Sequence, residues 1–175
     1  MVLYPQMKCK KVFVGLSGGV DSAVSALLLK QAGYDVTGVY IKGWQPEWIE
    51  CTWKDDRISA MRTAAHIDIP FLTLDGEAAY RDNVAQYMLR EYSAGRTPNG
   101  DMLCNREVKF GIFLKFALEN GADYIATGHY AQNLDGRIFE SADKEKDQTY
   151  FLSQLTQAQL KHTLFPIGHL QKSEV

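Results

Sequence analysis

The sequence predicts an α/β protein: an open, mostly parallel sheet with helices on both faces, giving three layers. Short apolar runs of strand type alternate with stretches whose apolar residues recur at helical spacing, and strand and helix follow one another repeatedly up to Tyr92. Such alternation gives parallel strands joined by right-handed crossovers. The length of 175 residues suits one domain, and 46% apolar with 23% charged residues is the balance of a globular protein.

The first strand and helix carry the clearest signals. Residues 12–14 are apolar and of β-branched or aromatic type, which suits a buried parallel strand. The helix after them should end at Gly33, because glycine is common just past a helix C-terminus. The buried stripe of this helix is expected to consist of Val20, Ala23, Val24, Leu27 and Leu28.

Later elements follow from the same reasoning. Strands are predicted over 36–41, 69–74 and 123–127, and helices over 55–65, 77–92 and 105–120. The helix over 55–65 is expected to bury Ile58, Met61, Ala64 and Ala65. Pro70 argues against a central place for its strand, and Asp135-Gly136 predicts a hairpin within 130–140.

Between the first strand and its helix lies a turn of Ser17, Gly18 and Gly19. Glycines let backbone N–H groups converge on an anion, and the positive end of the helix dipole points at the same place, so the turn suits a phosphate group. The usual γ-phosphate loop ends in Lys-Ser or Lys-Thr, but this chain has Asp21-Ser22, and its glycine spacing also fails the dinucleotide fingerprint. An ordinary tight turn with a capping aspartate is the alternative.

The hexapeptide Ser-Gly-Gly-Val-Asp-Ser over 17–22 resembles the signature of the PP-loop ATP pyrophosphatases, which cleave ATP between its α and β phosphates. The resemblance implies an adenine nucleotide alpha hydrolase-like fold with ATP and Mg²⁺ as cofactors. It also implies that the backbone amides of Gly18 and Gly19, with the hydroxyls of Ser17 and Ser22, hold the pyrophosphate, while Asp21 positions Mg²⁺.

Cys104 follows residues 93–103, which have the composition of a loop, and precedes a predicted helix. A thiol at or just before a helix N-terminus, with Arg106 and Lys109 close in sequence, is expected to have a lowered pKa. A small buried hydrophobic residue is the alternative. The three cysteines contain no CxxC pair, which indicates neither a disulfide framework nor a structural zinc or iron–sulfur site.

Two further stretches attract attention. Gly128 ends a predicted strand and would let a ligand approach closely, while His129 reads more readily as a hydrogen-bonded structural histidine than as a general base. Residues 44–53 hold all three tryptophans, and a packed loop and a lid over a ligand explain them equally well.

Five more segments narrow the resemblance to the tRNA 2-thiouridylase family. They are Ala-Gly-Arg-Thr-Pro-Asn at 94–99, Leu-Cys-Asn at 103–105, Val-Lys-Phe at 108–110, Ala-Thr-Gly-His-Tyr at 126–130 and Lys-Asp-Gln at 146–148. The likeness covers nearly the whole chain after Lys11. Members of this family adenylate the C2 oxygen of the wobble uridine in certain tRNAs and replace it by sulfur from a cysteine persulfide.

The resemblance also implies roles for individual residues. The ATP site would comprise Gly15, Leu16, Ser17, Gly18, Gly19, Val20, Asp21, Ser22, Ile41 and Gly128. The target base would meet Asn99, Gly100 and Asp101, and tRNA would touch Lys146, Asp147 and Gln148. Cys104 would be the nucleophile, with Asp101 as the candidate acid or base.

Two departures from the family pattern matter. Gly100 stands where the family usually has proline, so the loop that holds Asp101 is expected to be floppier. The family's second cysteine, which carries the persulfide, has no counterpart in Cys9 or Cys51. The expected organisation is an N-terminal extension (1–10), a PP-loop catalytic domain (11–140), and a tRNA-contacting segment (141–175) that starts a linker to a missing region.

Charge and hydropathy complete the expectations. The net charge of −2 and pI of about 6.1 give no global nucleic-acid signature, although residues 90–115 carry a small basic excess. The absence of a membrane-length apolar run or signal segment predicts a cytoplasmic protein with no membrane partner. A monomer is expected as well. Its expected partners are tRNA, ATP and a persulfide donor protein. Another PP-loop synthetase of amidotransferase type and a non-catalytic adenine-nucleotide module are the competing functions.

Overall fold

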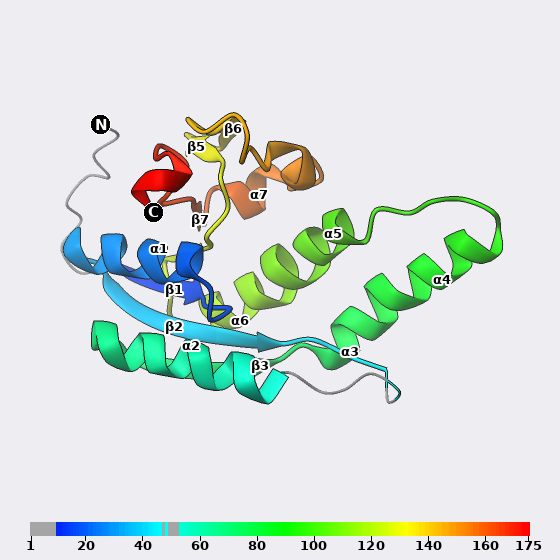
Figure 1. Cartoon of the computed structure of the whole chain (residues 1–175), viewed down its shortest axis with the longest axis horizontal. Coiled ribbons are helices and arrows are strands. Elements are labelled where there is room, and N and C mark those ends of the chain that lie inside the picture. The colour runs from blue at the N-terminus through cyan, green and yellow to red at the C-terminus, as the bar shows by residue number, and fades with distance from the viewer. Residues whose placement is uncertain (1–9, 47, 49–52) are drawn as a thin grey trace.

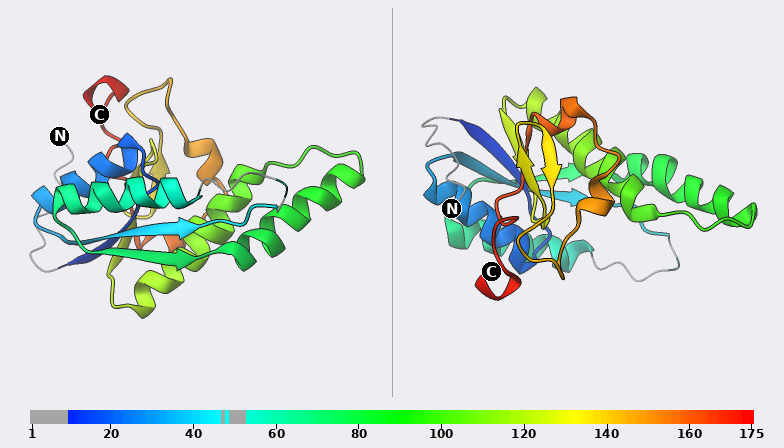
Figure 2. Two further views of the ribbon diagram at one scale, coloured as in Figure 1. Left: turned by 60° about the horizontal axis from the view of Figure 1, so that its bottom comes forward. Right: turned by 90° about the horizontal axis from the view of Figure 1, so that it is seen from above.

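The computed structural model describes residues 10–46, 48 and 53–175 and contains a five-stranded parallel sheet between two layers of helices (Figures 1 and 2). The strands lie in the order β3-β2-β1-β4-β7. Their bounds are Lys11–Gly15 (β1), Asp35–Lys42 (β2), Phe71–Asp75 (β3), Tyr124–Ala126 (β4) and Thr163–Leu164 (β7). The predicted three-layer α/β class is confirmed.

The central strand β1 shows how both faces of the sheet are buried. Successive side chains of a strand point to opposite faces. Val12 and Val14 therefore pack with α1 (Val20–Gln31) and α2 (Trp53–Ile67), whereas Phe13 packs on the other side with α6 (Phe113–Glu119). A continuous apolar run such as Val12–Val14 is what a strand covered on both sides requires.

The second helical layer consists of two long rods that project beyond the sheet, as Figure 1 shows. The first rod joins α3 (Glu77–Tyr80), the π-helical turn η1 (Arg81–Ala85) and α4 (Gln86–Ser93). The second joins α5 (Gly100–Leu103), the π-helical segment η2 (Cys104–Ile112) and α6.

The loop expected over 93–103 is shorter than predicted, because a helix begins at Gly100. Asn99 caps this helix, and its Oδ1 accepts the N–H of Met102 at 3.1 Å, a role that asparagine fills well. The loop expected at Asp101 is therefore wrong, because Gly100 and Asp101 lie in the first turn of a helix, and the greater flexibility expected from Gly100 stays a prediction. Position 100 is the first helical residue, where proline is also favoured.

The stripe predicted for α1 is wrong. Val20 is 56% exposed and Leu27 is 40% exposed, while the face against the sheet is formed by Ser22, Ser25, Ala26 and Leu29. The two serines can be buried because each hydroxyl donates to a backbone carbonyl one turn back, Ser22 to Gly19 and Ser25 to Asp21. Their small side chains let the helix lie close to the sheet.

The stripe predicted for α2 is confirmed at Ala64 and wrong at Ile58, Met61 and Ala65. Ala60 and Ala64 are buried, whereas Ile58 and Met61 are each more than one-third exposed. Small residues again form the fully buried contact in the middle of the helix, while Trp53 and Ile67 at its two ends pack partly against the same core. The predicted end of α1 is confirmed, because Gly33 follows the helix and has a φ of 88°.

Two further predictions about strands are confirmed. The Pro70 strand, β3, lies at the edge of the sheet. The predicted hairpin is formed by β5 (Gln132–Leu134) and β6 (Arg137–Phe139), and its turn residues Asp135 and Gly136 both have positive φ.

The last part of the chain returns to the sheet. It contains η3 (Thr149–Leu152), α7 (Gln157–Leu160), β7 and the short 3₁₀-helix η4 (Lys172–Glu174). Because β7 pairs with β4, residues after 140 extend the sheet, and the domain boundary predicted there stays a prediction. None of the described helices is both long and apolar enough to cross a bilayer.

Candidate functional site

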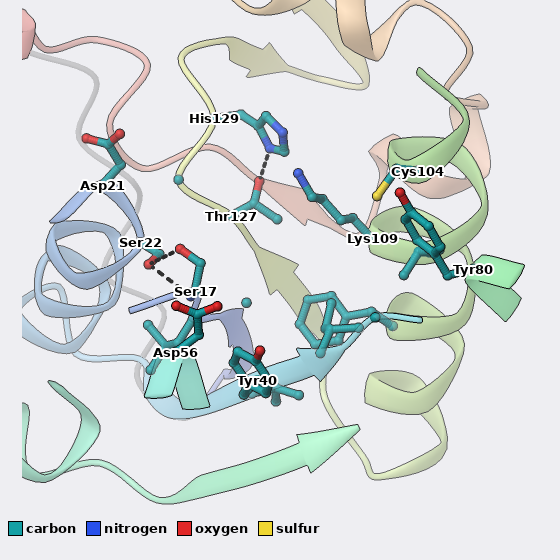
Figure 3. A pocket seen from close by; sticks show the side chains of 18 of the residues that line it. Ser17, Asp21, Ser22, Tyr40, Asp56, Tyr80, Cys104, Lys109, Thr127 and His129 are labelled. Atoms are coloured by element: carbon teal, nitrogen blue, oxygen red, sulfur yellow. Dashed lines mark hydrogen bonds between the residues drawn. The ribbon is translucent and has the colours of Figure 1, made fainter. Parts of the chain in front are cut away.

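A cavity of about 420 Å³ opens at the carboxyl ends of β1, β2 and β4, where open α/β sheets bind ligands (Figure 3). Its size lies within the range of small-molecule sites. On one side it is lined by the predicted phosphate loop, through Gly15, Leu16, Ser17, Asp21 and Ser22. The far wall is lined by Tyr80, Cys104, Val108, Lys109 and Phe113. Ile41 and Gly128 also line the cavity, as predicted for the ATP site.

The phosphate loop is held open for an anion. Gly18 has a φ of 86°, and a Cβ there would lie 2.9 Å from Cβ of Ser59, so glycine is needed for both conformation and space. Gly19 is the N-cap of α1 and provides no side-chain acceptor for the first N–H groups of that helix. Those unused donors and the helix dipole suit a phosphate oxygen. Gly18, Gly19 and Val20 themselves are not among the residues lining the cavity.

Asp21 anchors the phosphate loop to the last part of the chain. Its Oδ1 accepts the hydroxyl of Tyr130 at 3.1 Å and pairs with Nζ of Lys172 at 2.5 Å. The pair joins residues 151 positions apart, so η4 lies over the N-terminal turn of α1.

The residues present fit a magnesium ion that arrives with a nucleotide. No cluster of three metal-ligating side chains occurs in the part of the chain that the structure describes. Mg²⁺ bound to nucleotide phosphates needs only one or two protein carboxylates. Asp56 lies beside Ser17 in the cavity, as Figure 3 shows, and offers such oxygens. Asp21 also lines the cavity, but its carboxylate would have to release Lys172 and Tyr130 to bind the ion.

Gly128 lets β4 approach α1. A Cβ at this position would lie 2.7 Å from the backbone N of Ser22 and 2.8 Å from the backbone C of Asp21. We expect Gly128→Ala to push the N-terminal turn of α1 away and to weaken ATP binding at least about tenfold, roughly 1.4 kcal/mol. Isothermal titration calorimetry with ATP measures the effect.

The matched control for that substitution is Gly43→Ala. Gly43 lines the same cavity, but a Cβ there would meet nothing within 4 Å. Equal ATP affinities for the two variants would contradict the role of Gly128 as the spacer between β4 and the phosphate loop.

Cys104 lies on the cavity wall opposite the phosphate loop, which agrees with a reacting thiol that faces a bound nucleotide (Figure 3). Its predicted low pKa is wrong. Burial raises the pKa of the thiol, Asp101 raises it further, and Lys109 opposes both. The helix starts at Gly100, so Cys104 lies one turn beyond the N-terminus. Arg106 is engaged with Glu107 and Gln154 instead.

His129 is buried, and its Nδ1 forms a 2.7 Å hydrogen bond with the hydroxyl of Thr127. The expected structural histidine is confirmed. Burial, and then the nearby Lys109 ammonium, lowers the pKa of His129 to about 3, so the ring is neutral at physiological pH.

The buried imidazole predicts a loss of stability in acid. The unfolded chain binds a proton near pH 6.5 and the folded chain only near pH 3, so stability decreases as pH falls between these values, by at most about 1.4 kcal/mol per pH unit. Urea unfolding at pH 7 and pH 5 should show a loss about 2 kcal/mol larger for the natural protein than for His129→Gln. A glutamine retains polar atoms near Thr127, and equal losses would contradict the prediction.

The three residues predicted to meet the target base lie at the start of the Cys104 helix. Asn99 caps it, Gly100 packs against Met88, and Asp101 is exposed. None of the three lines the cavity, although all precede Cys104 by no more than about a turn and a half.

The predicted tRNA-contacting residues divide into two kinds. Asp147 accepts hydrogen bonds from Ser141 and Thr149, and so holds its own loop. Gln148 exchanges two hydrogen bonds with the backbone of Tyr130, at 3.0 and 2.9 Å, and lines the cavity. Lys146 is exposed. The geometry thus leaves Lys146 as the outward-facing member of the three.

Several residues that line the cavity were not predicted from the sequence. The polar ones are Tyr40, Asp56, Tyr80 and Thr127. Tyr40 and Thr127 stand at the carboxyl ends of β2 and β4, and the strand-end rule could have found them. Asp56 and Tyr80 come from helices, and no local signal marks them. The lid hypothesis for residues 44–53 falls largely outside the described residues, as do Cys9 and Cys51.

Comparison with known families gives a match over almost the whole chain. The family model described as "tRNA methyl transferase HUP domain" matches residues 10–175.

Curated relatives match the chain at high identity. A protein named tRNA-specific 2-thiouridylase MnmA from Christiangramia forsetii is 53% identical over 95% of this chain and 45% of its own length. Proteins of the same name from Streptococcus thermophilus and Lactococcus lactis subsp. cremoris are 54% identical over 94% of this chain and 46% of theirs. The chain therefore spans about half the length of the curated relatives it matches.

Solved structures share the fold at low identity. A 4-thiouridine synthetase in complex with RNA and bound ATP superposes with a TM-score of 0.61, at 18% identity, over 94% of this chain and 38% of that one. A predicted subunit of a tRNA methyltransferase from Methanocaldococcus jannaschii gives 0.57 at 16% identity, over 94% of this chain and 71% of that one. These likenesses agree with the three-layer architecture described above.

Proposed function

The chain belongs to the tRNA methyl transferase HUP domain family, and from that premise we propose that it forms the ATP-using part of a tRNA-uridine 2-sulfurtransferase. Relatives at 53–54% identity bear the name tRNA-specific 2-thiouridylase, which supports the proposal. The observation that carries it is the shared cavity: the phosphate loop and Cys104 line opposite walls of one space of about 420 Å³. A nucleotide bound on one wall would present its α phosphate to a base that enters beside the thiol.

The proposed reaction has three steps. The C2 oxygen of the uridine attacks the α phosphorus of ATP, which forms an O-adenylated base and releases pyrophosphate. The terminal sulfur of a persulfide, R–S–S⁻, then attacks C2 and AMP leaves, so that the base carries a C2–S–S–R group. The Cys104 thiolate attacks the sulfur bound to R, which forms a Cys104–R disulfide and leaves 2-thiouridine.

One wall of the cavity would bind the nucleotide. The N–H groups at the start of α1 and the hydroxyls of Ser17 and Ser22 would bind the leaving pyrophosphate. Asp21 and Asp56 would hold Mg²⁺, which neutralises phosphate charge when bound. Gly15, Leu16, Ile41 and Gly128 would contact the adenine and ribose.

The other wall would receive the RNA. Asn99, Gly100 and Asp101 would meet the uridine, with Asp101 as the candidate acid or base for proton transfer near Cys104. Lys146 would contact the tRNA phosphates, with Asp147 and Gln148 shaping the loop that carries it. We place the protein in the cytoplasm as a monomer that receives sulfur from a persulfide donor protein.

The test supplies the full-length product of the gene with tRNA transcripts, Mg–ATP and a persulfide donor, and analyses the digested tRNA by mass spectrometry. We expect 2-thiouridine at the wobble position, with AMP and pyrophosphate formed only when tRNA is present. Complete absence of the thiolated nucleoside under these conditions would contradict the proposal.

Two competing functions give different results in the same assay. An amidotransferase-type synthetase of the PP-loop class would keep its activity after Cys104 is removed, because ammonia rather than sulfur attacks. A non-catalytic nucleotide-binding module would bind ATP without releasing pyrophosphate, even with tRNA present. The position of Cys104 on the nucleotide cavity argues against both.

A further inference from the structure

The cavity contains a cation that the proposed reaction does not yet use. Among the described residues that line it, Lys109 is the one lysine or arginine. Figure 3 shows its side chain pointing into the space between the phosphate loop and the Cys104 wall. No local sequence signal favours Lys109 over Arg106, which lies closer to Cys104 along the chain.

The helix that carries both residues has an unusual winding. Residues 104–112 form a π-helix, η2, in which hydrogen bonds join residues five apart and each turn holds more residues than in an α-helix. π-Helical segments are rare in proteins, and those that do occur often lie at functional sites. In η2 and the start of α6, the residues that line the cavity are Cys104, Val108, Lys109 and Phe113.

That spacing is the expected result of the π-helical winding. In an α-helix successive residues turn by about 100°, so Lys109, five residues after Cys104, would point about 140° away from it. With the wider turn of a π-helix, residue i+5 returns close to the direction of residue i. The winding of η2 therefore turns Lys109 toward the cavity, onto the same face of the helix as Cys104.

The charged and titratable groups around the thiol point to the same lysine. Asp101, on the same helix, disfavours the thiolate, and Lys109 favours it. Tyr80, from α3, interacts electrostatically with Cys104, and burial raises the pKa of its phenol. His129, across the cavity, is neutral. Lys109 is thus the positive group that acts on the thiol.

We propose that Lys109 is a positioning residue that favours the thiolate form of Cys104 from the same wall of the nucleotide cavity, and that the π-helical winding of η2 brings the two side chains to one face. The assignment rests on the proposed function insofar as Cys104 is the reacting thiol. Burial and Asp101 already outweigh the ammonium in their effect on the pKa of the thiol. Without the ammonium the thiolate fraction would fall further, and the thiolate is the nucleophile.

The test measures how fast iodoacetamide alkylates Cys104 as a function of pH. The protein carries Cys9→Ser and Cys51→Ser, so that Cys104 is its single thiol among three natural cysteines. Neither ATP nor tRNA is added. For Lys109→Met we expect the midpoint of the rate profile to rise by about one pH unit, and the rate at pH 7.5 to fall about tenfold. Lys109→Arg should restore most of the rate.

The matched control is Lys115→Met, because Lys115 is an exposed lysine on the same helical rod. We expect its profile to equal that of the natural lysine protein. Thermal unfolding establishes that each variant is folded. An unchanged midpoint in folded Lys109→Met would overturn the proposal, and so would an equal shift in Lys115→Met.

A second measurement separates Lys109 from a simple phosphate ligand. ATP affinity, measured by calorimetry, should differ less than about threefold between Lys109→Met and the natural protein. A large loss of ATP affinity with an unchanged alkylation profile would overturn the proposal and make Lys109 a phosphate-binding residue. Because alkylation needs no tRNA, a protein that made no 2-thiouridine but showed the shifted midpoint would refute the proposed function alone.

Discussion

Replacing Cys104 with alanine should lower the rate of 2-thiouridine formation by a factor of about 10³ or more, because the step that frees the thiolated base then has no attacking sulfur. ATP binding should be unchanged, since the thiol lies on the wall opposite the phosphate loop. The rate is measured by mass spectrometry of digested tRNA in single-turnover reactions, and ATP affinity by calorimetry.

Cys104→Ser provides the isosteric control, because a hydroxyl fills the same space without thiolate chemistry. It should be as inactive as the alanine variant and should still release pyrophosphate when tRNA is added. A serine variant that forms 2-thiouridine at the natural rate would show that the sulfur of Cys104 does not take part.

Gly168→Ala should destabilise the protein by about 4 kcal/mol, which ranks among the largest effects of single substitutions. A Cβ at Gly168 would lie 1.7 Å from the carbonyl oxygen and 2.5 Å from the carbonyl carbon of Ala131. Both are backbone atoms of a fully buried residue, so no side chain can rotate out of the way. Denaturant unfolding followed by circular dichroism measures the loss.

The effect at Gly168 should also reach the nucleotide site. Ala131 follows Tyr130, whose hydroxyl donates to Asp21 of the phosphate loop, so a shift of this backbone should weaken ATP binding in the fraction that remains folded. Gly43→Ala again provides the control, since a Cβ there meets nothing within 4 Å. Equal stability of the two alanine variants would contradict the close approach of Gly168 to Ala131.

Lys172 contacts the phosphate loop, although it lies far from this loop in the sequence. Lys172 pairs with Asp21 at 2.5 Å, and its backbone N–H donates to Asp143 at 2.8 Å. Asp143 in turn accepts the N–H of Lys146, the exposed lysine proposed to contact tRNA. One short network therefore connects the proposed tRNA contact with the phosphate loop.

Local signals in the sequence determined the order of the elements and the position of the phosphate loop. The apolar run of β1, the turn over Ser17–Gly19 and the stop at Gly33 depend only on neighbouring residues, and the structure confirms the strand, the turn and the stop. The resemblance of short motifs identified the family for the same reason, because a motif is a property of consecutive residues.

Tertiary structure alone decided which helix faces are buried and whether the pKa of the Cys104 thiol is raised or lowered. The apolar residues Val20 and Leu27 stay exposed because small residues give α1 its closest fit to the sheet. The pKa of Cys104 rises because burial, which depends on the packing of distant segments, outweighs the charges near it in sequence. Lys109 reaches the cavity because η2 winds as a π-helix, and the amino-acid pattern, read at α-helical spacing, would place it on another face.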